Sequence, residues 1–133
     1  MTLLIDADWL IYSSCCACEQ DVRWNEDLHT LHADERDVHE MVDGRISHYQ
    51  NIAEGDKDVV MCYTEYPTFR HTIYPEYKAN RKHKRKPLGL GKIIEQTKER
   101  YQSESYSGLE GDDVMAVLAT SKKYPDPIIV SVD

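Results

Sequence analysis

Three acidic residues crowd into one short stretch of the sequence, GLEGDDVMAVLAT at residues 108–120. Glu110, Asp112 and Asp113 stand directly before an apolar run that begins at Val114. Carboxylates this close repel one another, and each is costly to remove from water unless a positive charge lies between them. A divalent metal ion would satisfy all three. Capping and the helix dipole also favour acids at the start of a helix, which explains one or two of them without a metal.

Further acids follow other apolar runs. Asp6 ends the run at residues 2–6, Glu65 follows the run at 58–64, and Asp133 ends the run at 127–133. Such continuous runs are typical of strands buried on both faces, and ligands of open α/β sheets bind at the carboxyl ends of the strands. We therefore expect a cluster of oxygen ligands for two Mg²⁺ or Mn²⁺ ions at this edge. The expected ligands are Asp6, Glu65, Glu110, Asp112, Asp113 and Asp133.

The segments between these runs predict an α/β fold. Apolar residues at helical spacing between Val38 and Ala53 predict a helix with Asp34 as its N-cap and Gly55 as its stop. Residues 91–101 and 110–123 predict two further helices, separated by a short strand at 102–107. The order β-α-β-α-β-α-β favours a mainly parallel β-sheet flanked by helices. With 133 residues, we expect one domain.

Charge is distributed unevenly along the chain. The net charge is −8, yet Arg70 to Lys92 contains eight basic residues and one acid. Tyr74 and Tyr77 are interleaved with these cations. A charge run is often only a solvated face, but cations beside aromatic rings are typical of surfaces that bind single-stranded nucleic acid. We expect this segment to guide phosphates towards the acids.

Other residue types carry less information about function. Cys15 and Cys18 form a C-x-x-C pair, but no second pair or suitably spaced histidines follow, which favours reduced cysteines over a zinc or redox site. The six histidines are scattered and are expected on surfaces or helices. No apolar run is long enough to span a membrane and the start lacks the features of a signal peptide, so we expect a cytoplasmic protein without membrane contact.

Four stretches of the chain resemble a known family. In order, LLIDADWLIY, PTFRHTIYPEYKANRKHKRKP, LEGDDVMAVLAT and IIVSVD are similar to the 5′-nuclease family, the flap endonucleases and 5′→3′ exonucleases of the PIN-like superfamily. The likeness covers nearly the whole chain and is particularly close to short bacteriophage exonucleases that degrade duplex DNA from 5′ ends. It implies an amino-terminal catalytic domain at residues 1–133, an arch-like basic segment at 70–92, DNA 5′ ends and flaps as substrates, and the host cytoplasm as location.

The resemblance also implies roles for individual residues. Lys78 and Arg81 would contact the scissile phosphate, and Tyr77 would pack near the terminal base. Glu65 stands near the position where the family usually has a strand-end aspartate. The catalytic residues would be Asp6, Lys78, Arg81, Glu110, Asp112, Asp113 and Asp133. The DNA-binding residues would be Arg70, Tyr77, Lys78, Arg81, Lys82, Lys84, Arg85 and Lys86.

The sequence departs from the family pattern after Asp133. Family members continue with a helix-three-turn-helix element that grips duplex DNA and with further acids, so the chain resembles the amino-terminal half of such a nuclease. The leading hypothesis is two-metal hydrolysis of DNA. The alternative is a non-catalytic DNA-binding module that needs a second chain to complete the site. A PIN-type ribonuclease, which normally lacks the basic arch, ranks lowest. An exposed last strand would also favour a homodimer or a complementary partner chain.

Overall fold

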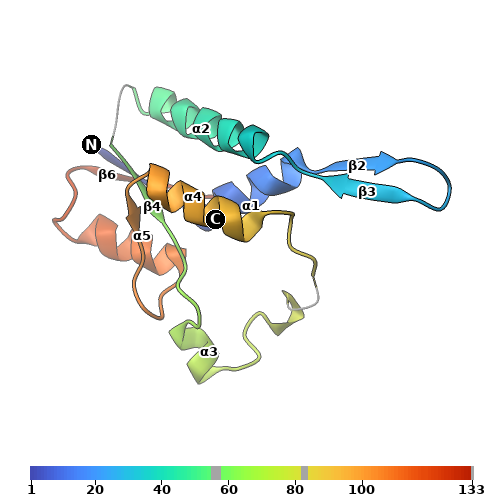
Figure 1. Ribbon diagram of the computed structural model, residues 1–133. Helices are drawn as coiled ribbons and strands as arrows, with labels where there is room; N and C mark the ends of the chain where they lie inside the picture. The colour runs from blue at the N-terminus through green and yellow to red at the C-terminus, as the bar shows by residue number, and fades with distance from the viewer. Residues whose placement is uncertain (55–57, 82–83, 133) are drawn as a thin grey trace.

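A parallel four-stranded sheet forms the centre of the molecule (Figure 1). The computed structural model describes residues 1–54, 58–81 and 84–132, so Gly55, Lys82 and Asp133 of the predictions above lie outside the described residues. The strands are β1 (Thr2–Asp6), β4 (Asp58–Cys62), β5 (Ser103–Glu104) and β6 (Pro127–Val130). Their order is β5-β4-β1-β6, and every pairing is parallel. The predicted α/β fold with a parallel sheet is confirmed.

Helices cover both faces of this sheet (Figure 1). They are α1 (Ala7–Cys18), α2 (Glu35–Ile52), α3 (Phe69–Ile73), α4 (Leu90–Arg100) and α5 (Gly111–Thr120), with a short 3₁₀ turn, η1 (Ala79–Arg81), after α3. The helices α1, α2 and α4 pack on one face, whereas α5 packs on the other. None of the helices in the described part of the chain is long and apolar enough to cross a membrane.

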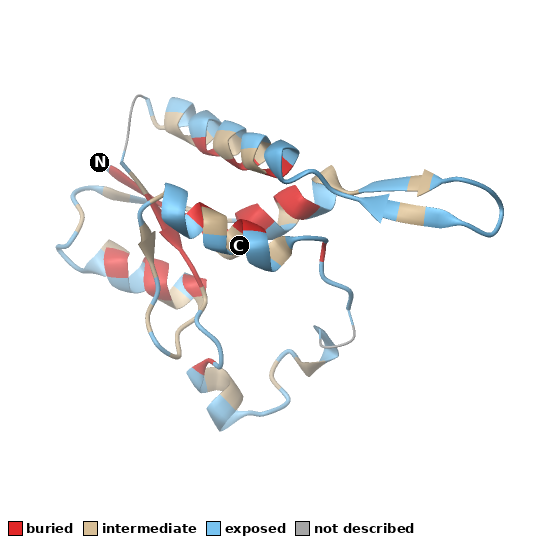
Figure 2. Ribbon diagram, viewed as in Figure 1, coloured by how far each residue is buried: buried red, intermediate tan, exposed pale blue. Residues whose placement is uncertain are grey.

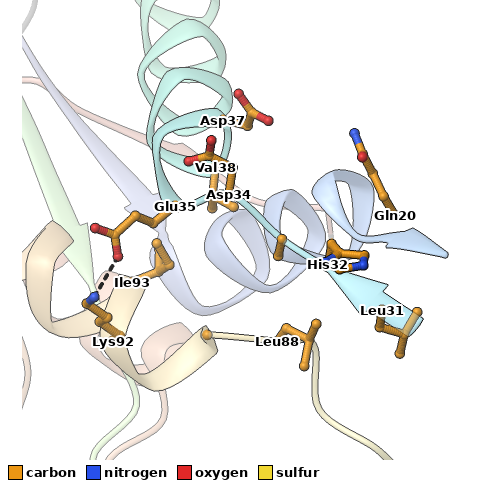
Figure 3. A pocket seen from close by; sticks show the side chains of 12 residues that line it. Gln20, Leu31, His32, Asp34, Glu35, Asp37, Val38, Leu88, Lys92 and Ile93 are labelled. Atoms are coloured by element: carbon orange, nitrogen blue, oxygen red, sulfur yellow. Dashed lines mark ion pairs between the residues drawn. The ribbon is translucent and has the colours of Figure 1, made fainter. Parts of the chain in front are cut away.

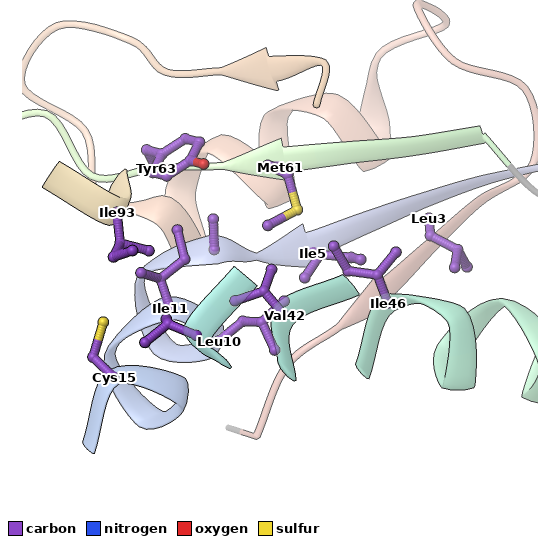
Figure 4. Packing of buried hydrophobic residues seen from close by; sticks show 12 residues of the cluster. Leu3, Ile5, Leu10, Ile11, Cys15, Val42, Ile46, Met61, Tyr63 and Ile93 are labelled. Atoms are coloured by element: carbon purple, nitrogen blue, oxygen red, sulfur yellow. The ribbon is translucent and has the colours of Figure 1, made fainter. Parts of the chain in front are cut away.

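The central strand β1 is buried along its whole length (Figure 2). Successive side chains of a strand point to opposite faces, so Leu3 and Ile5 join the cluster beneath α1, α2 and α4, while Leu4 joins the cluster beneath α5. Figure 4 shows Ile5 packed among Leu10, Val42 and Met61. The end of β1, which carries Asp6, is therefore held by packing on both sides.

Several elements were not predicted from the sequence. The segment ADWLIYSSCCAC forms α1, which was not predicted because its apolar residues lie around most of the helix and leave no clear polar stripe. The largely polar segment after it forms a hairpin of β2 (Gln20–Arg23) and β3 (His29–His32) that extends from the body (Figure 1). The predicted helices correspond to α2, α4 and α5, and Asp34 is the N-cap of α2.

Candidate active-site cleft

Two carboxylates lie where β1 passes directly into α1. Asp6 ends the strand and also caps the helix, because its Oδ1 accepts a hydrogen bond from the Trp9 N–H at 3.4 Å. Asp8 lies in the first turn of α1, and its Oδ2 accepts a hydrogen bond from the Thr64 N–H at 2.8 Å. Thr64 follows β4, the neighbour of β1 in the sheet. Both acids are thus fixed at the carboxyl edge of the sheet.

The start of α5 approaches the same two carboxylates. The Gly111 N–H donates a hydrogen bond to the Thr64 Oγ1 at 2.9 Å. A Cβ atom at Gly111 would lie 3.3 Å from Oδ2 of Asp8 and 3.7 Å from Oδ1 of Asp6. The absence of a side chain at Gly111 therefore lets α5 come close to both acids. Its neighbours Glu110 and Asp112 are brought to the same edge.

These acids form part of the wall of a cleft of about 650 Å³. The wall also includes basic residues from the segment after α3, and aromatic rings from α1 and the loop after β4. The acids are Asp6, Asp8, Glu110 and Asp112; the basic residues are Lys78, Arg81, Lys84 and Lys86; the aromatic residues are Trp9, Tyr12 and Tyr66. One cleft therefore combines a carboxylate cluster, a group of cations and stacking surfaces.

Seven residues predicted from the sequence thus share one cleft. They are Asp6, Lys78, Arg81, Lys84, Lys86, Glu110 and Asp112. Asp8, Trp9 and Tyr12 were not predicted as site residues, because α1 itself was not predicted. One sequence feature indicates Asp8, namely its position two residues after Asp6 and directly after a predicted strand.

Asp113 and Arg70 are bound to each other. Two hydrogen bonds of 2.6 and 2.9 Å join the Arg70 guanidinium to the two carboxylate oxygens of Asp113. The Asp113 Oδ2 also accepts a hydrogen bond from the Glu110 N–H at 3.1 Å. The hydrogen bonds from Arg70 hold the pKa of Asp113 below its usual range. This geometry agrees with the helix-capping interpretation for Asp113 and occupies the Arg70 side chain that was expected to contact DNA.

Lys78 lies between the basic segment and the acids. Its backbone adopts the left-handed conformation, with φ of 53°, and its Nζ lies 3.5 Å from Oε1 of Glu110. Tyr77 beside it makes an edge-to-face contact with His71, and the ring centroids are 5.5 Å apart. Glu65 is placed differently, because its Oε2 accepts a hydrogen bond from the Ser105 hydroxyl at 3.4 Å. Glu65 does not line the cleft.

The carboxylates suit a divalent cation by their chemistry, since clustered carboxylate oxygens are the ligands that Mg²⁺ and Mn²⁺ prefer. In residues 1–54, 58–81 and 84–132, however, no group of three or more acidic, histidine or cysteine side chains is arranged so that it could hold a metal ion. Asp133, the sixth expected ligand, lies outside those ranges. The ligand type fits the expected ions, and the number of ions stays a prediction.

Burial raises the pKa of the Asp8 carboxyl above its ordinary value. The charged form of Asp8 is thus less favourable in the folded than in the unfolded chain. It therefore destabilises the folded chain at pH values above the ordinary pKa of an aspartate. We expect Asp8→Asn, without added metal, to raise the Tm at pH 7 by about 3 °C. The gain should disappear near pH 3, where both states carry a neutral Asp8. Thermal unfolding at both pH values tests this, and an unchanged Tm at pH 7 would contradict it.

A larger hollow of about 800 Å³ lies elsewhere, between β3 and the starts of α2 and α4 (Figure 3). Three of its charged side chains are engaged with one another or with the backbone. Lys92 binds Glu35 at 2.8 Å, and Asp34 accepts the Arg36 N–H at 2.9 Å. The cleft at the end of β1 therefore remains the better candidate for chemistry, despite its smaller volume.

Comparisons with known proteins identify a family for this chain. The family model described as 5′-3′ exonuclease, N-terminal resolvase-like domain matches residues 1–133. The chain is 31% identical over 124 residues to the exodeoxyribonuclease of Enterobacteria phage T3 and to the exonuclease of Escherichia phage T7. Each match covers 90% of this chain and 41% of the relative.

A flap endonuclease Xni of Shewanella sp. (strain MR-4) is 39% identical over 70 residues, which covers 50% of this chain and 27% of that protein. No solved structure matches the chain significantly. The chain thus spans 41% of the length of the phage relatives. On the match over residues 1–133, together with the parallel sheet and the strand-end acids, the chain belongs to the 5′-3′ exonuclease family as an N-terminal, resolvase-like domain.

Proposed function

We propose that the chain carries the catalytic site of a metal-dependent nuclease that hydrolyses DNA phosphodiester bonds near 5′ ends and flaps. The observation that carries this proposal is the single cleft whose wall combines Asp6, Asp8, Glu110 and Asp112 with Lys78, Arg81, Lys84 and Lys86. Carboxylates hold divalent cations, and lysine and arginine side chains hold phosphates. A phosphodiester is a substrate that needs both.

Each group in the cleft has a distinct role in this proposal. Asp6, Asp8, Glu110 and Asp112 would hold the metal ions, Mg²⁺ or Mn²⁺, for which two sites are proposed. The chemistry that divalent ions supply at such a site is a lowered pKa of water and stabilisation of charge on the leaving oxygen. Lys78 and Arg81 bind the phosphate and offset its growing negative charge. The Trp9 and Tyr12 rings offer surfaces on which unpaired bases can stack.

The Lys78–Glu110 contact connects the basic residues of the cleft with its acids. At 3.5 Å, the Lys78 ammonium is close enough to be attracted to the Glu110 carboxylate, and both residues line the cleft. A phosphate held by Lys78 would therefore lie near the acids at the start of α5.

Cleavage of 5′-labelled DNA tests the proposal directly. The chain is incubated with flap, blunt duplex and single-stranded substrates in Mg²⁺ or Mn²⁺, with EDTA as the control. We expect metal-dependent release of short 5′ products. Lys78→Ala should lower cleavage, while Lys122→Ala, at an exposed position outside the cleft lining, should not. Cleavage that persists in EDTA would contradict the proposal.

A second candidate is a DNA-binding module that needs another chain to complete the site. The observation that favours it is that the described side chains include no ready-made group of three metal ligands. In that case the same experiment gives DNA binding, weakened by salt, without cleavage in any metal. Cleavage should then appear when a second chain is added that corresponds to the carboxyl-terminal part of a phage relative.

The edge strand β6 supports association with a partner. Ile128 and Ile129 are 36% and 49% exposed, and β6 pairs only with β1 among the described strands. Exposed apolar edge strands can pair with another chain. We expect a homodimer or a complementary chain at this edge. For a homodimer, light scattering of the pure chain should give a mass that rises with concentration. A constant monomer mass across the series would argue against self-association.

A further inference from the structure

Residues 85–88 of the basic segment are attached to the end of α1 by Glu19. This residue is the C-cap of α1, and only 11% of its side chain is exposed. Its carboxylate accepts two hydrogen bonds from the Arg85 guanidinium, at 2.8 Å to Oε1 and 2.7 Å to Oε2. The Leu88 N–H donates a third, at 2.7 Å to Oε1. One carboxylate thus holds both a side chain and the backbone of the segment.

This contact is stronger than an ordinary surface ion pair. A guanidinium bound through two parallel hydrogen bonds to a carboxylate has a defined orientation as well as a favourable charge interaction. The Arg85 side chain also donates to the carbonyl oxygen of Lys86 at 3.1 Å. The hydrogen bonds from Arg85 and Leu88 lower the pKa of Glu19 to about 2, so it is charged at neutral pH.

The position of Glu19 relates the segment to the cleft. Helix α1 starts at the acids, with Asp6 as its N-cap, and its C-cap Glu19 lies about 20 Å further along the helix. Lys84 and Lys86 flank Arg85 in sequence, and both line the cleft together with Tyr12 of α1. A fixed Arg85 therefore limits where these two lysines can lie relative to the acids.

We propose that Glu19 is a positioning residue that anchors residues 85–88 to the end of α1 and so keeps Lys84 and Lys86 in the wall of the acidic cleft. On this view Arg85 is a structural anchor, and the neighbouring lysines contact the phosphates. The proposal rests on the proposed function in one respect, because it takes DNA as the ligand of the cleft. The anchoring itself can be measured without DNA.

Glu19→Gln is the variant that separates anchoring from charge. Glutamine is similar in size but removes the charge and one of the two carboxylate acceptors for Arg85. Glu26→Gln, in the exposed loop between β2 and β3, changes the net charge by the same amount and is the matched control. Arg85→Lys is a second test, since lysine keeps the charge but cannot form the two parallel hydrogen bonds.

The first measurement is hydrogen exchange of the Leu88 amide in the protein without DNA. We expect roughly tenfold faster exchange in Glu19→Gln than in the wild type, with no change in Glu26→Gln. The second measurement is the Kd for a fluorescent single-stranded oligothymidylate. We expect it to rise about fivefold in Glu19→Gln and in Arg85→Lys, because Lys84 and Lys86 lose their fixed positions.

The sign of the change in DNA binding decides between two roles for Glu19. If Glu19 only masked Arg85, its removal would free a cation and strengthen binding, as would the loss of any negative charge. Binding by Glu19→Gln equal to or tighter than that of Glu26→Gln would therefore overturn the proposal, as would unchanged exchange of the Leu88 amide. Faster exchange in a chain whose wild type binds no DNA would support the anchor and count against the nuclease function.

Discussion

Asp6→Asn is expected to lower metal-dependent cleavage of 5′-labelled DNA at least about 100-fold, because each strong ligand to a catalytic metal supports several kcal/mol of transition-state stabilisation. Asparagine keeps the helix cap on α1, since Asn and Asp are similarly good N-caps. The fold should therefore survive, with little change in Tm. Titration of Mn²⁺ should also show weaker binding, which links the lost activity to the metal.

Asp34→Asn is the matched control for this prediction. Asp34 is also an aspartate that caps a helix, and it accepts the Arg36 N–H at the start of α2, away from the cleft. Its replacement should leave cleavage and Mn²⁺ binding unchanged. Asp6→Asn with the cleavage rate of the wild type would exclude Asp6 from the catalytic site. If the wild-type chain binds metal but cuts no DNA, the Mn²⁺ titration still distinguishes the two aspartates.

Ile5→Ala is expected to reduce the free energy of unfolding by about 3 kcal/mol, because it removes buried methyl groups and leaves a cavity. Ile5 is fully buried in the cluster beneath α1, α2 and α4. For a domain of this size, the loss corresponds to a Tm lower by roughly 10 °C. Denaturant and thermal unfolding measure both quantities.

Ile129→Ala in β6 removes the same atoms from a side chain that is 49% exposed and provides the comparison. We expect it to cost less than half as much, because part of that side chain already contacts water. Equal losses for the two variants would mean that β6 is covered in solution. That result would support the partner proposed for this edge.

The sequence predicted the position of the cleft better than it predicted which residues are in it. Asp6 and Asp112 could be assigned to one edge because parallel strands end together, which follows from chain order alone. The Arg70–Asp113 and Arg85–Glu19 pairs join residues far apart in the chain, and no spacing rule indicates them. Two cations expected to contact DNA are therefore used within the fold.

Helix α1 shows the same limit at the level of secondary structure. Its apolar face cannot be recognised from periodicity, because Trp9, Leu10, Ile11 and Cys15 follow one another closely around the helix. Its burial becomes clear only when α2 and α4 are placed beside it. Asp8 and Tyr12 depend on this helix, so both were missed together with it.

The sheet order has a consequence for how the chain acquires its fold. The central strand β1 precedes both of its partners in the chain, because its register pairs Leu4 with Val60 on one side and with Ile129 on the other. Strand pairings between distant parts of a chain slow folding, because a long loop must close before any pairing energy is gained. The most buried strand of the sheet therefore stays unpaired until the segments that form its partners have been made. Binding of a chaperone to the β1 segment of the nascent chain is the expected result.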